Sequence, residues 1–564
     1  MKRFVILFFA CALFFSSCSG YLDKYPLDTP SDQTFLANET EMEMALAGCY
    51  TPIWVSNGTS LSYLVVFEEL SDNGYERGPN AVTELGQGSA DALNSFVLDS
   101  WTEFYRGIAR CNYLLSNMSR GEAAVSAATC ARIQAEAKFL RAFYYSYLVE
   151  LFGDVPLLTE PVTLAEAQLP RTAKSQVVDL ILKDLTEAAA VLSPVNNPTS
   201  GRPSKGAALA LKARTALYGG RWQDAVSAAS EVMAMEGSQY IIDPDYAGLF
   251  TYPGQTSKET VFSIQYLKGQ SVHAAYGVFG SRNGRGATSR KPAYQLQDVY
   301  ECIDGLPIDK SPLYDPQHPY ENRDPRLQYT LAVPGSEFLG FQFETHGDSL
   351  QCWNYLTSPP SRVDNLDATH AYATFTGICW RKYANVEDRL AGTNCDNNII
   401  VMRYAELLLI YAEAKIKAGQ IDDSVLEAIN KVRQRPSVNM PPVTTRDPDE
   451  LFQAVARERR YELSGEGQRL FDIRRWKIAE EVMNLPLLGR MKKSYPAKPP
   501  RINQWANVHY EDTDIPVAEP GQSTDFAMRV VDIRKFNPNK DYVWPIPYIE
   551  RRTNPNLTQN PGWE

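Results

Sequence analysis

The feature of this sequence that most constrains its fold is a pattern that occurs twice, far apart in the chain. Residues 210–232 read "ALKARTALYGGRWQDAVSAASEV", and residues 409–431 read "LIYAEAKIKAGQIDDSVLEAINK". Each stretch predicts an alanine-rich helix, a glycine turn, an aspartate cap and a second helix. Because small residues allow two helices to approach closely, the repeat predicts tetratricopeptide-like helical pairs. The matched positions are Ala213 and Ala412, Gly220 and Gly419, Asp224 and Asp423, Val226 and Val425, and Ala229 and Ala428.

Further helices are predicted on both sides of these pairs. Residues 130–151 carry apolar side chains at helical spacing, and Gly153 and Pro156 follow as helix breakers. Other helices are expected over 174–192, 204–236, 448–464 and 468–483. The predicted fold class is therefore mainly α, a tetratricopeptide-like helical-pair scaffold with large irregular, loop-rich insertions.

Two long segments lack this periodicity. Residues 237–400 and 484–564 are rich in proline, glycine and polar residues, with only short strand-like runs such as "TVFSIQYL". Irregular segments on a rigid scaffold frequently carry function, so we expect ligand contacts in 237–400. The predicted division is an N-terminal helical region over 35–236, the loop-rich insertion over 237–400, C-terminal helical pairs over 401–483 and an irregular region over 484–564.

The charge of the chain restricts its partners. The formal net charge is −11 over 564 residues, of which 44% are hydrophobic. The chain can therefore bury a substantial core. An acidic surface repels phosphate backbones, so we expect no nucleic-acid partner.

The N-terminus has the shape of an export signal. Positive residues precede an apolar run over 4–15, and small residues follow up to "FSSC", which ends at Cys18. The run is too short for a membrane span, which needs about 20 residues. The pattern predicts a signal peptide over 1–17 and a tether over 18–34. "FSSC" resembles the motif in which bacterial lipoproteins acylate the cysteine after the cleaved bond, and the alternative is an ordinary signal peptide with an incidental cysteine.

The remaining cysteines form no CxxC motif and no zinc-finger spacing with histidine. Without Cys11 in the leader and Cys18, seven remain, so at least one is a free thiol or bonds another molecule. We expect buried free thiols that pack as small apolar residues. The seven are Cys49, Cys111, Cys130, Cys302, Cys352, Cys379 and Cys395.

The sequence offers no recognisable catalytic motif. It has five histidines and no HExxH, GxSxG or P-loop pattern. The glycine-rich "GSRNGRGA" over 280–287 lacks the spacing of a nucleotide site, and we interpret it as a loop. The densest charged stretch, "RERRYELSGEGQRLFDIRRWK" over 457–477, allows an acid/base site, but its alternating signs favour an ion-pair network between packed helices. We predict no catalytic residue, no cofactor and no metal.

Nine stretches spread over nearly the whole chain resemble a known family, the SusD/RagB-like lipoproteins of Bacteroidetes. They are "CSGYLDKYPLD", "WTEFYRGIARCNYLL", "AEAKFLRAFYYSYLVELFGDVPLL", "SKGAALALKARTALYGGRWQDA", "RDPRL", "VMRYAELLLIYAEA", "AINKVRQR", "RERRYELSGEGQRLFDIRRWK" and "VWPIPYIERRTNPNLTQNPGW". All nine stretches occur in this chain in the same order as in the family, which makes the resemblance specific. The final stretch, with its prolines and aromatic residues, is interpreted as structural.

The resemblance implies a location, a partner and a ligand. It implies an outer-membrane lipoprotein that faces outward, anchored through an acylated Cys18. It implies a partner, a SusC-like TonB-dependent transporter that the protein covers as a lid. It implies binding without catalysis, the capture of an oligosaccharide before import. The alternatives are a peptide-binding lid of the same fold and a surface glycoside hydrolase.

The resemblance also indicates where the ligand is bound. In this family the site tends to be built from the loop before the "WTEFY" helix and from the central insertion, which here are 71–80 and 270–390. Sugars need a flat aromatic face and forked polar groups. The alternative for each residue is core packing or a solvated surface. The candidate ligand-binding residues are Asp72, Asn73, Tyr75, Arg77, Arg282, Asn283, Trp353, Asn354 and Tyr355.

Overall fold

The computed structural model describes residues 35–54, 61–163, 166–510 and 513–564. The predicted signal peptide, the acylated Cys18 and the tether over 18–34 lie outside these residues. Among the described residues, no helix is both long enough and apolar enough to cross a bilayer.

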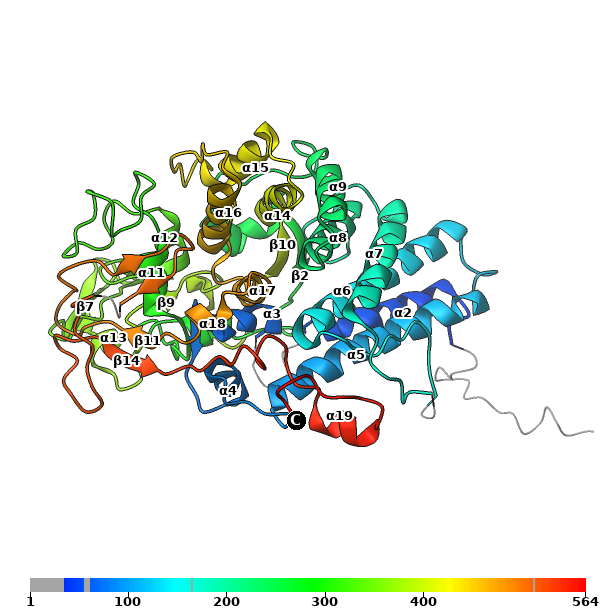
Figure 1. Ribbon diagram of the computed structural model, residues 1–564, viewed down its shortest axis with the longest axis horizontal. Helices are drawn as coiled ribbons and strands as arrows, with labels where there is room; N and C mark the ends of the chain where they lie inside the picture. Colours follow the sequence, from blue (N-terminus) through cyan, green and yellow to red (C-terminus); the bar gives the residue numbers. More distant parts are fainter. Residues whose placement is uncertain (1–34, 55–60, 164–165, 511–512) are drawn as a thin grey trace, which may run out of the picture.

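A row of packed helices forms one half of the molecule (Figure 1). Successive helices of this row, α5 to α9, contact one another, and α14 continues the row by packing against α9. The mainly α fold class is confirmed. The bounds are α2 Glu39–Tyr50, α5 Ser95–Asn117, α6 Ala127–Phe152, α7 Lys174–Val191, α8 Lys205–Tyr218, α9 Trp222–Met233, α14 Tyr404–Lys417, α15 Asp423–Arg433 and α16 Pro448–Leu463.

The repeated pattern forms the two helical pairs that it predicts, α8–α9 and α14–α15. Gly220 and Gly419 have φ values of 72° and 69°, a left-handed conformation that glycine adopts without steric cost. The predicted aspartate caps are wrong. Asp224 lies inside the first turn of α9, and Asp423 is the first residue of α15, whose cap is Asp422.

The last predicted helix, over 468–483, is also corrected. The structure divides it into α17 (Arg469–Arg475) and α18 (Ala479–Val482). Lys477, between them, has a φ of 60°, and a left-handed residue cannot continue a right-handed helix. Sequence periodicity does not reveal such a single-residue interruption.

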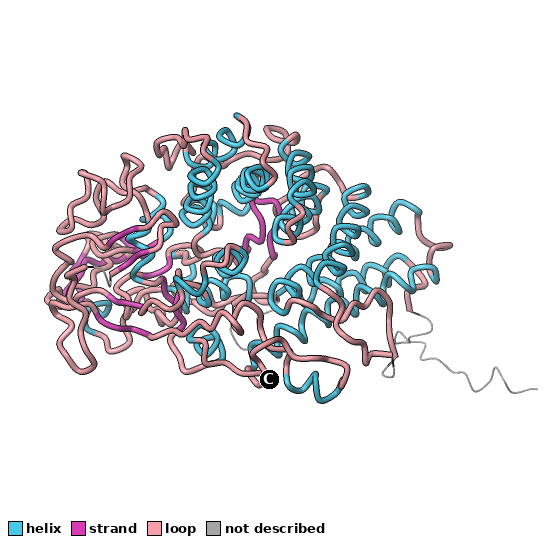
Figure 2. The backbone as a smooth tube through the Cα atoms, viewed as in Figure 1, coloured by secondary structure: helices cyan, strands magenta, loops and turns pink. Residues whose placement is uncertain are grey.

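The other half of the molecule is built from loops, short helices and small sheets (Figure 2). The predicted strand in "TVFSIQYL" is confirmed as β2 (Thr260–Ile264), which pairs with β10 (Ile399–Arg403) directly before α14. The short helices are α3 Tyr63–Val66, α4 Ala81–Gln87, α10 Ala275–Phe279, α11 Tyr294–Val299, α12 Arg326–Thr330, α13 Leu366–Thr369 and α19 Tyr548–Thr553.

The strands of this half form one four-stranded sheet, in the order β5-β6-β7-β8, and five two-stranded ribbons, among the described residues. The sheet strands are β5 Glu337–Phe338, β6 Phe341–Gln342, β7 Gln351–Asn354 and β8 Ser361–Asp364. Besides β2–β10, the ribbons pair β1 Gly74–Glu76 with β3 Arg290–Pro292, β4 Leu331–Ala332 with β9 Cys379–Trp380, β11 Leu487–Gly489 with β14 Arg529–Asp532, and β12 Arg501–Ile502 with β13 Val508–His509.

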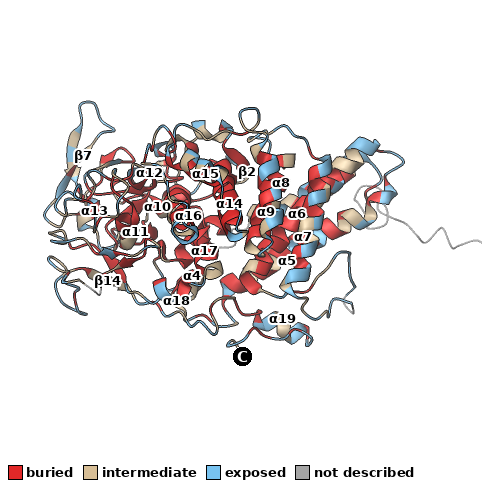
Figure 3. Ribbon diagram, turned by 45° about the horizontal axis from the view of Figure 1, so that its top comes forward, coloured by how far each residue is buried: buried red, intermediate tan, exposed pale blue. Residues whose placement is uncertain are grey.

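One hydrophobic core runs through both halves, from Leu36 to Leu557 (Figure 3). The C-terminal segment closes it. The ring of Trp544 packs against the rings of Phe67, Phe96 and Phe152, with centroids about 6 Å apart. This confirms the structural interpretation of the final stretch, while the division of the chain into segments stays a prediction.

The seven cysteines of the described residues are all free thiols, and all but Cys130 are buried. Cys49 and Cys111 lie in α2 and α5 inside the core. Their burial fits the expectation that these cysteines pack as small apolar residues.

Candidate functional site

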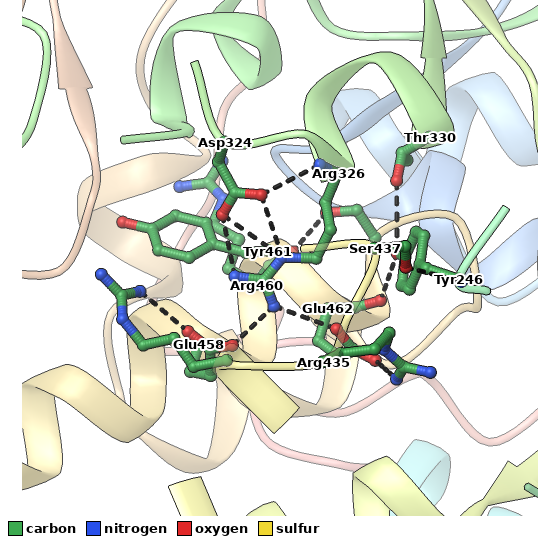
Figure 4. Close-up of polar contacts among 12 residues, drawn as sticks. Tyr246, Asp324, Arg326, Thr330, Arg435, Ser437, Glu458, Arg460, Tyr461 and Glu462 are labelled. Atoms are coloured by element: carbon green, nitrogen blue, oxygen red, sulfur yellow. Dashed lines mark hydrogen bonds and ion pairs between the residues drawn. The ribbon is translucent and has the colours of Figure 1, made fainter. Parts of the chain in front are cut away.

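Figure 4 shows a buried network of charged side chains around α16. The guanidinium of Arg326 contacts the carboxylates of Asp324, Glu458 and Glu462, with N–O distances of 2.8, 2.5 and 2.9 Å. Arg435 contacts Glu462 at 2.6 Å. All five side chains are buried. Buried charges persist only when they are paired and hydrogen-bonded, as they are here.

Glu462 is the centre of this network because it also contacts Arg403, at 2.5 Å. Burial alone would raise its pKa, but the charges of Arg435, Arg403 and Arg326 outweigh burial and hold the pKa of this carboxyl well below its usual range. A carboxylate held ionised by three guanidiniums does not serve as a proton donor at neutral pH.

Most other charges of residues 457–477 are paired in the same way, whereas Arg474 has no ion pair among the described residues. Arg459 and Arg475 bind Asp472, and Glu466 binds Lys382 and Arg403. The interpretation of this stretch as an ion-pair network is therefore confirmed.

Two of the predicted ligand-binding residues belong to the scaffold. The carboxylate of Asp72 contacts Arg460 at 2.7 Å and Arg469 at 2.8 Å. Asn73 is fully buried and accepts a hydrogen bond of 2.9 Å from Arg460. These contacts fasten the 71–80 segment to α16 and α17, so both side chains are engaged within the protein, and their direct contact with a ligand stays a prediction.

The next part of that segment reaches the surface beside the central insertion. In the β1–β3 ribbon Tyr75 is opposite Lys291, and the N–H of Arg77 donates to the carbonyl of Ser289 at 2.8 Å. The guanidinium of Arg77 lies 5.0 Å from the ring centroid of Tyr372 and donates to its carbonyl at 3.1 Å. Tyr372 is 59% exposed, so Arg77 supports an aromatic ring that faces solvent.

Arg282 lies next to this pair. Its Nη2 is 3.2 Å from Nε2 of His370, two residues before Tyr372. The backbone N–H groups of Arg282 and Asn283 donate to Asp367, and the Asn283 side chain donates to the carbonyl of Asp364 at 2.8 Å. Asn283 thus positions the glycine-rich loop, and Arg282 is partly exposed, with Nη1 donating to the carbonyl of Gly286 in the same loop at 3.0 Å.

Further cations surround the neighbouring rings. Nζ of Lys291 lies 4.4 Å from the ring centroid of Phe375 and 5.5 Å from that of Tyr75. Arg529, on β14, lies 4.3 Å from Phe375. Burial, followed by the charge of Arg77, lowers the pKa of Lys291 to about 7.

We call this surface the cation–aromatic face. It comprises the partly exposed cations Arg77, Arg282 and Arg529, the fully buried Lys291 behind them, and the rings of Tyr75, Tyr372 and Phe375. Tyr75 is only 8% exposed, so it forms the wall of the face, whereas Tyr372 forms its outer edge.

The remaining three candidates lie on the β7–β8 hairpin. Trp353 is 40% exposed, and the guanidinium of Arg362 lies 5.1 Å from its ring. Oδ1 of Asn354 accepts from the N–H of Leu356 at 3.0 Å and so shapes the turn. Tyr355 lines an open cleft of about 920 Å³. Other residues of the cleft wall are Phe250, Tyr329, Phe338, Leu356 and Arg381.

The nine candidates therefore do not form one cluster. Arg77 and Arg282 contact Tyr372 and His370, which are two positions apart. Trp353 and Tyr355 share the exposed hairpin, and the others hold the scaffold or its turns. Sequence reasoning did not single out Lys291, His370, Tyr372, Phe375 or Arg529. The first four lie inside the predicted 270–390 region, but nothing in the sequence points to Arg529.

The described residues contain no cluster of three or more His, Cys, Asp or Glu side chains that could hold a metal ion.

A helical-pair scaffold that carries exposed aromatic and cationic side chains on its loops defines a class of binding protein. Comparisons with known proteins identify the family. The profile described as SusD family matches residues 251–563, and one described as starch-binding associating with outer membrane matches residues 21–217. The chain belongs to the SusD family.

Individual relatives agree with this assignment. A solved SusD-like carbohydrate binding protein from Bacteroides fragilis is 31% identical, with a TM-score of 0.78 over 93% of this chain and 100% of that one. A second SusD-like protein from the same species is 26% identical, with a TM-score of 0.75 over 96% and 100%. The SusD-like protein P25 of Formosa agariphila is 26% identical over 85% of this chain and 90% of that protein.

Proposed function

We propose that this protein captures a glycan outside the cell and delivers it to a SusC-like TonB-dependent transporter in the outer membrane. Its membership in the SusD family and the carbohydrate-binding description of its Bacteroides fragilis relative support this proposal. The observation that carries it is the exposed ring of Tyr372 held against Arg77. A flat ring contacts the C–H face of a sugar, and the guanidinium beside it donates to hydroxyls.

The proposed ligand contacts are Arg77, Arg282 and Tyr372 on the cation–aromatic face and Trp353 and Tyr355 on the β7–β8 hairpin. Asn283 links the two places, because it fastens the glycine-rich loop to the carbonyl of Asp364 at the end of β8. A glycan chain that runs from the face along the hairpin would contact both. We propose binding without catalysis, since the acids of the 457–477 stretch are committed to ion pairs.

Isothermal titration against plant, host and storage glycans tests the proposal. We expect binding of at least one glycan, and we expect Tyr372→Ala to weaken it about tenfold, which corresponds to about 1.4 kcal/mol for the loss of an aromatic contact. Tyr548→Ala is the matched control, since Tyr548 is similarly exposed and lies on α19.

The alternatives give different results in the same assay. Peptide binding without any glycan binding would replace the proposal with a peptide-capturing lid. New reducing ends after incubation of pure protein with glycans would indicate a surface hydrolase.

The membrane anchor is a separate part of the proposal. We propose that acylated Cys18 holds the protein on the outer membrane, where several acyl chains bind far more firmly than one. Cys18→Ala should appear in the soluble fraction, and its co-purification with the transporter from membranes should fall. A surface-exposed variant that still fractionates with the outer membrane would place the anchor elsewhere.

A further inference from the structure

The cation–aromatic face carries positive charge that the protein does not neutralise. Within the described residues, none of Arg77, Arg282, Lys291 and Arg529 has a carboxylate within ion-pair distance. Of the guanidinium nitrogens of Arg77, only Nη1 donates to the described part of the protein, at the carbonyl of Tyr372, so Nε and Nη2 remain available to a ligand. This is unusual in a chain with a net charge of −11, in which acids are in excess.

The nearest acids are committed elsewhere. Glu76 pairs with Arg290, and both side chains are buried. Asp367 is buried and accepts the backbone N–H groups of Arg282 and Asn283 instead of a guanidinium. Asp532 accepts from the side chain of Gln87 at 2.7 Å. The local acids therefore shape the loops and leave the guanidiniums of the face without counterions.

The cations are also close enough to repel one another. Burial lowers the pKa of Arg77, and the charge of Arg282 lowers it further. The charge of Arg77 in turn lowers the pKa of Lys291, whose Nζ has no hydrogen-bond partner in the described structure. Like charges held together at a cost to stability are characteristic of a site that awaits an opposite charge.

We propose that this face selects an anionic glycan, whose carboxylate or sulfate groups supply the counterions that its cations lack. The inference rests on the proposed glycan capture and names the class of glycan. Arginine suits this role because its planar fork binds carboxylate and sulfate oxygens through two parallel hydrogen bonds. The exposed ring of Tyr372, beside Arg77, would meet the apolar face of the same sugar unit.

Paired probes test the charge of the ligand apart from its sugar chain. The probes are an oligogalacturonate with its carboxyl-reduced counterpart and a sulfated galactan oligosaccharide with its desulfated counterpart. Titration calorimetry should show at least one anionic probe binding about tenfold to hundredfold tighter than its neutral counterpart, because a hydrogen bond to a charged group contributes about 1.5–3 kcal/mol. Added salt should weaken that binding.

Substitutions of single arginines test whether the anionic probe binds at the cation–aromatic face. Arg77→Gln and Arg282→Gln should each abolish most of the preference for the anionic probe, and Arg77→Lys should restore part of it, since lysine keeps the charge but not the fork. Arg552→Gln is the matched control, because Arg552 is exposed and lies 5.9 Å over the ring of Tyr548 on α19. Melting temperatures should not fall, since none of these arginines is in an ion pair of the described structure.

Three outcomes would overturn the inference. Equal affinity for a neutral probe and its anionic counterpart would reject the anionic class and leave glycan capture intact. Equal losses of affinity for the anionic probe in Arg77→Gln and Arg552→Gln would show that the anion binds outside the face. Failure of all four probes, with binding of a neutral glycan from the wider panel, would reject the anionic class, and failure of that panel as well would reject glycan capture itself.

Discussion

Around Glu462 three arginines share one buried carboxylate, whereas on the cation–aromatic face Arg77 and Arg282 lie close together with no carboxylate between them. The first set is buried and paired with carboxylates, and the second is partly exposed and lies beside rings. Arginine is abundant in both places, so its presence alone does not distinguish a structural from a binding role. The distinction lies in whether the chain supplies the counterion.

A substitution in the network around Glu462 should lower the stability of the protein more than a substitution on the cation–aromatic face. Glu462→Gln leaves Arg326, Arg403 and Arg435 short of a charge in the interior, so we expect a loss of about 3–5 kcal/mol in the free energy of unfolding. Chemical denaturation measures it. Glu387→Gln, at an exposed position on the cleft wall, should change stability by less than about 0.5 kcal/mol. A small loss in Glu462→Gln would mean that water reaches the network.

Substitutions of the two tyrosines of the face should have different effects, one on stability and the other on glycan binding. Tyr75 packs with Ala293 and Leu487, so Tyr75→Ala should cost about 3 kcal/mol of stability through the cavity that it leaves. Tyr372→Ala should leave the melting temperature nearly unchanged and weaken glycan binding. Equal melting temperatures for the two variants would contradict this assignment of wall and outer edge.

Lys291 should behave in the opposite way to Glu462. Lys291→Met removes a fully buried ammonium that has no hydrogen-bond partner in the described structure, so we expect a gain of about 1 kcal/mol or more in the free energy of unfolding at pH 7. Lys268→Met, at an exposed position, is the control and should change stability little. Destabilisation by Lys291→Met would show that the ammonium has a partner in solution.

The same lysine predicts a dependence of stability on pH. Its pKa is lowered to about 7 in the folded chain, against about 10.4 when unfolded. Between these values the unfolded chain holds a proton that the folded chain lacks, so this group makes stability rise with pH over that window. Denaturation at pH 7 and at pH 9 should show that rise in the wild type and a smaller rise in Lys291→Met.

Lowering the pH should weaken the contribution of the Glu462 network to the free energy of unfolding, and we expect this to be the smallest of the effects described. The pKa of Glu462 is below its usual value when folded, so its stabilising contribution is complete above about pH 4.3 and declines as pH falls below it. The stability difference between the wild type and Glu462→Gln should therefore shrink between pH 5 and pH 3. A constant difference would mean that Glu462 is not ionised in the folded state.

The helical scaffold was predictable because its signals are local. The turn glycines Gly220 and Gly419 and the spacing of the apolar residues act within a few positions of one another. The sites were less predictable because their partners are distant. Asp72 contacts Arg469, which is 397 positions away, and Arg77 contacts Tyr372, which is 295 positions away. No local sequence pattern reveals that Arg469 is paired with a carboxylate and that Arg77 is not.

The closure of the core by the C-terminal segment has a consequence for how the chain acquires its structure. The side chain of Asn560 donates to the carbonyls of Phe152 and Trp544, at 2.9 and 2.7 Å. Contacts between residues so far apart form slowly, because a long loop must close before they contribute. Since this late segment completes the packing around α5 and α6, we expect the native core to form only after residues near 544–560 have joined it. Until then, the apolar side chains that meet Trp544 remain accessible to other chains, which favours aggregation.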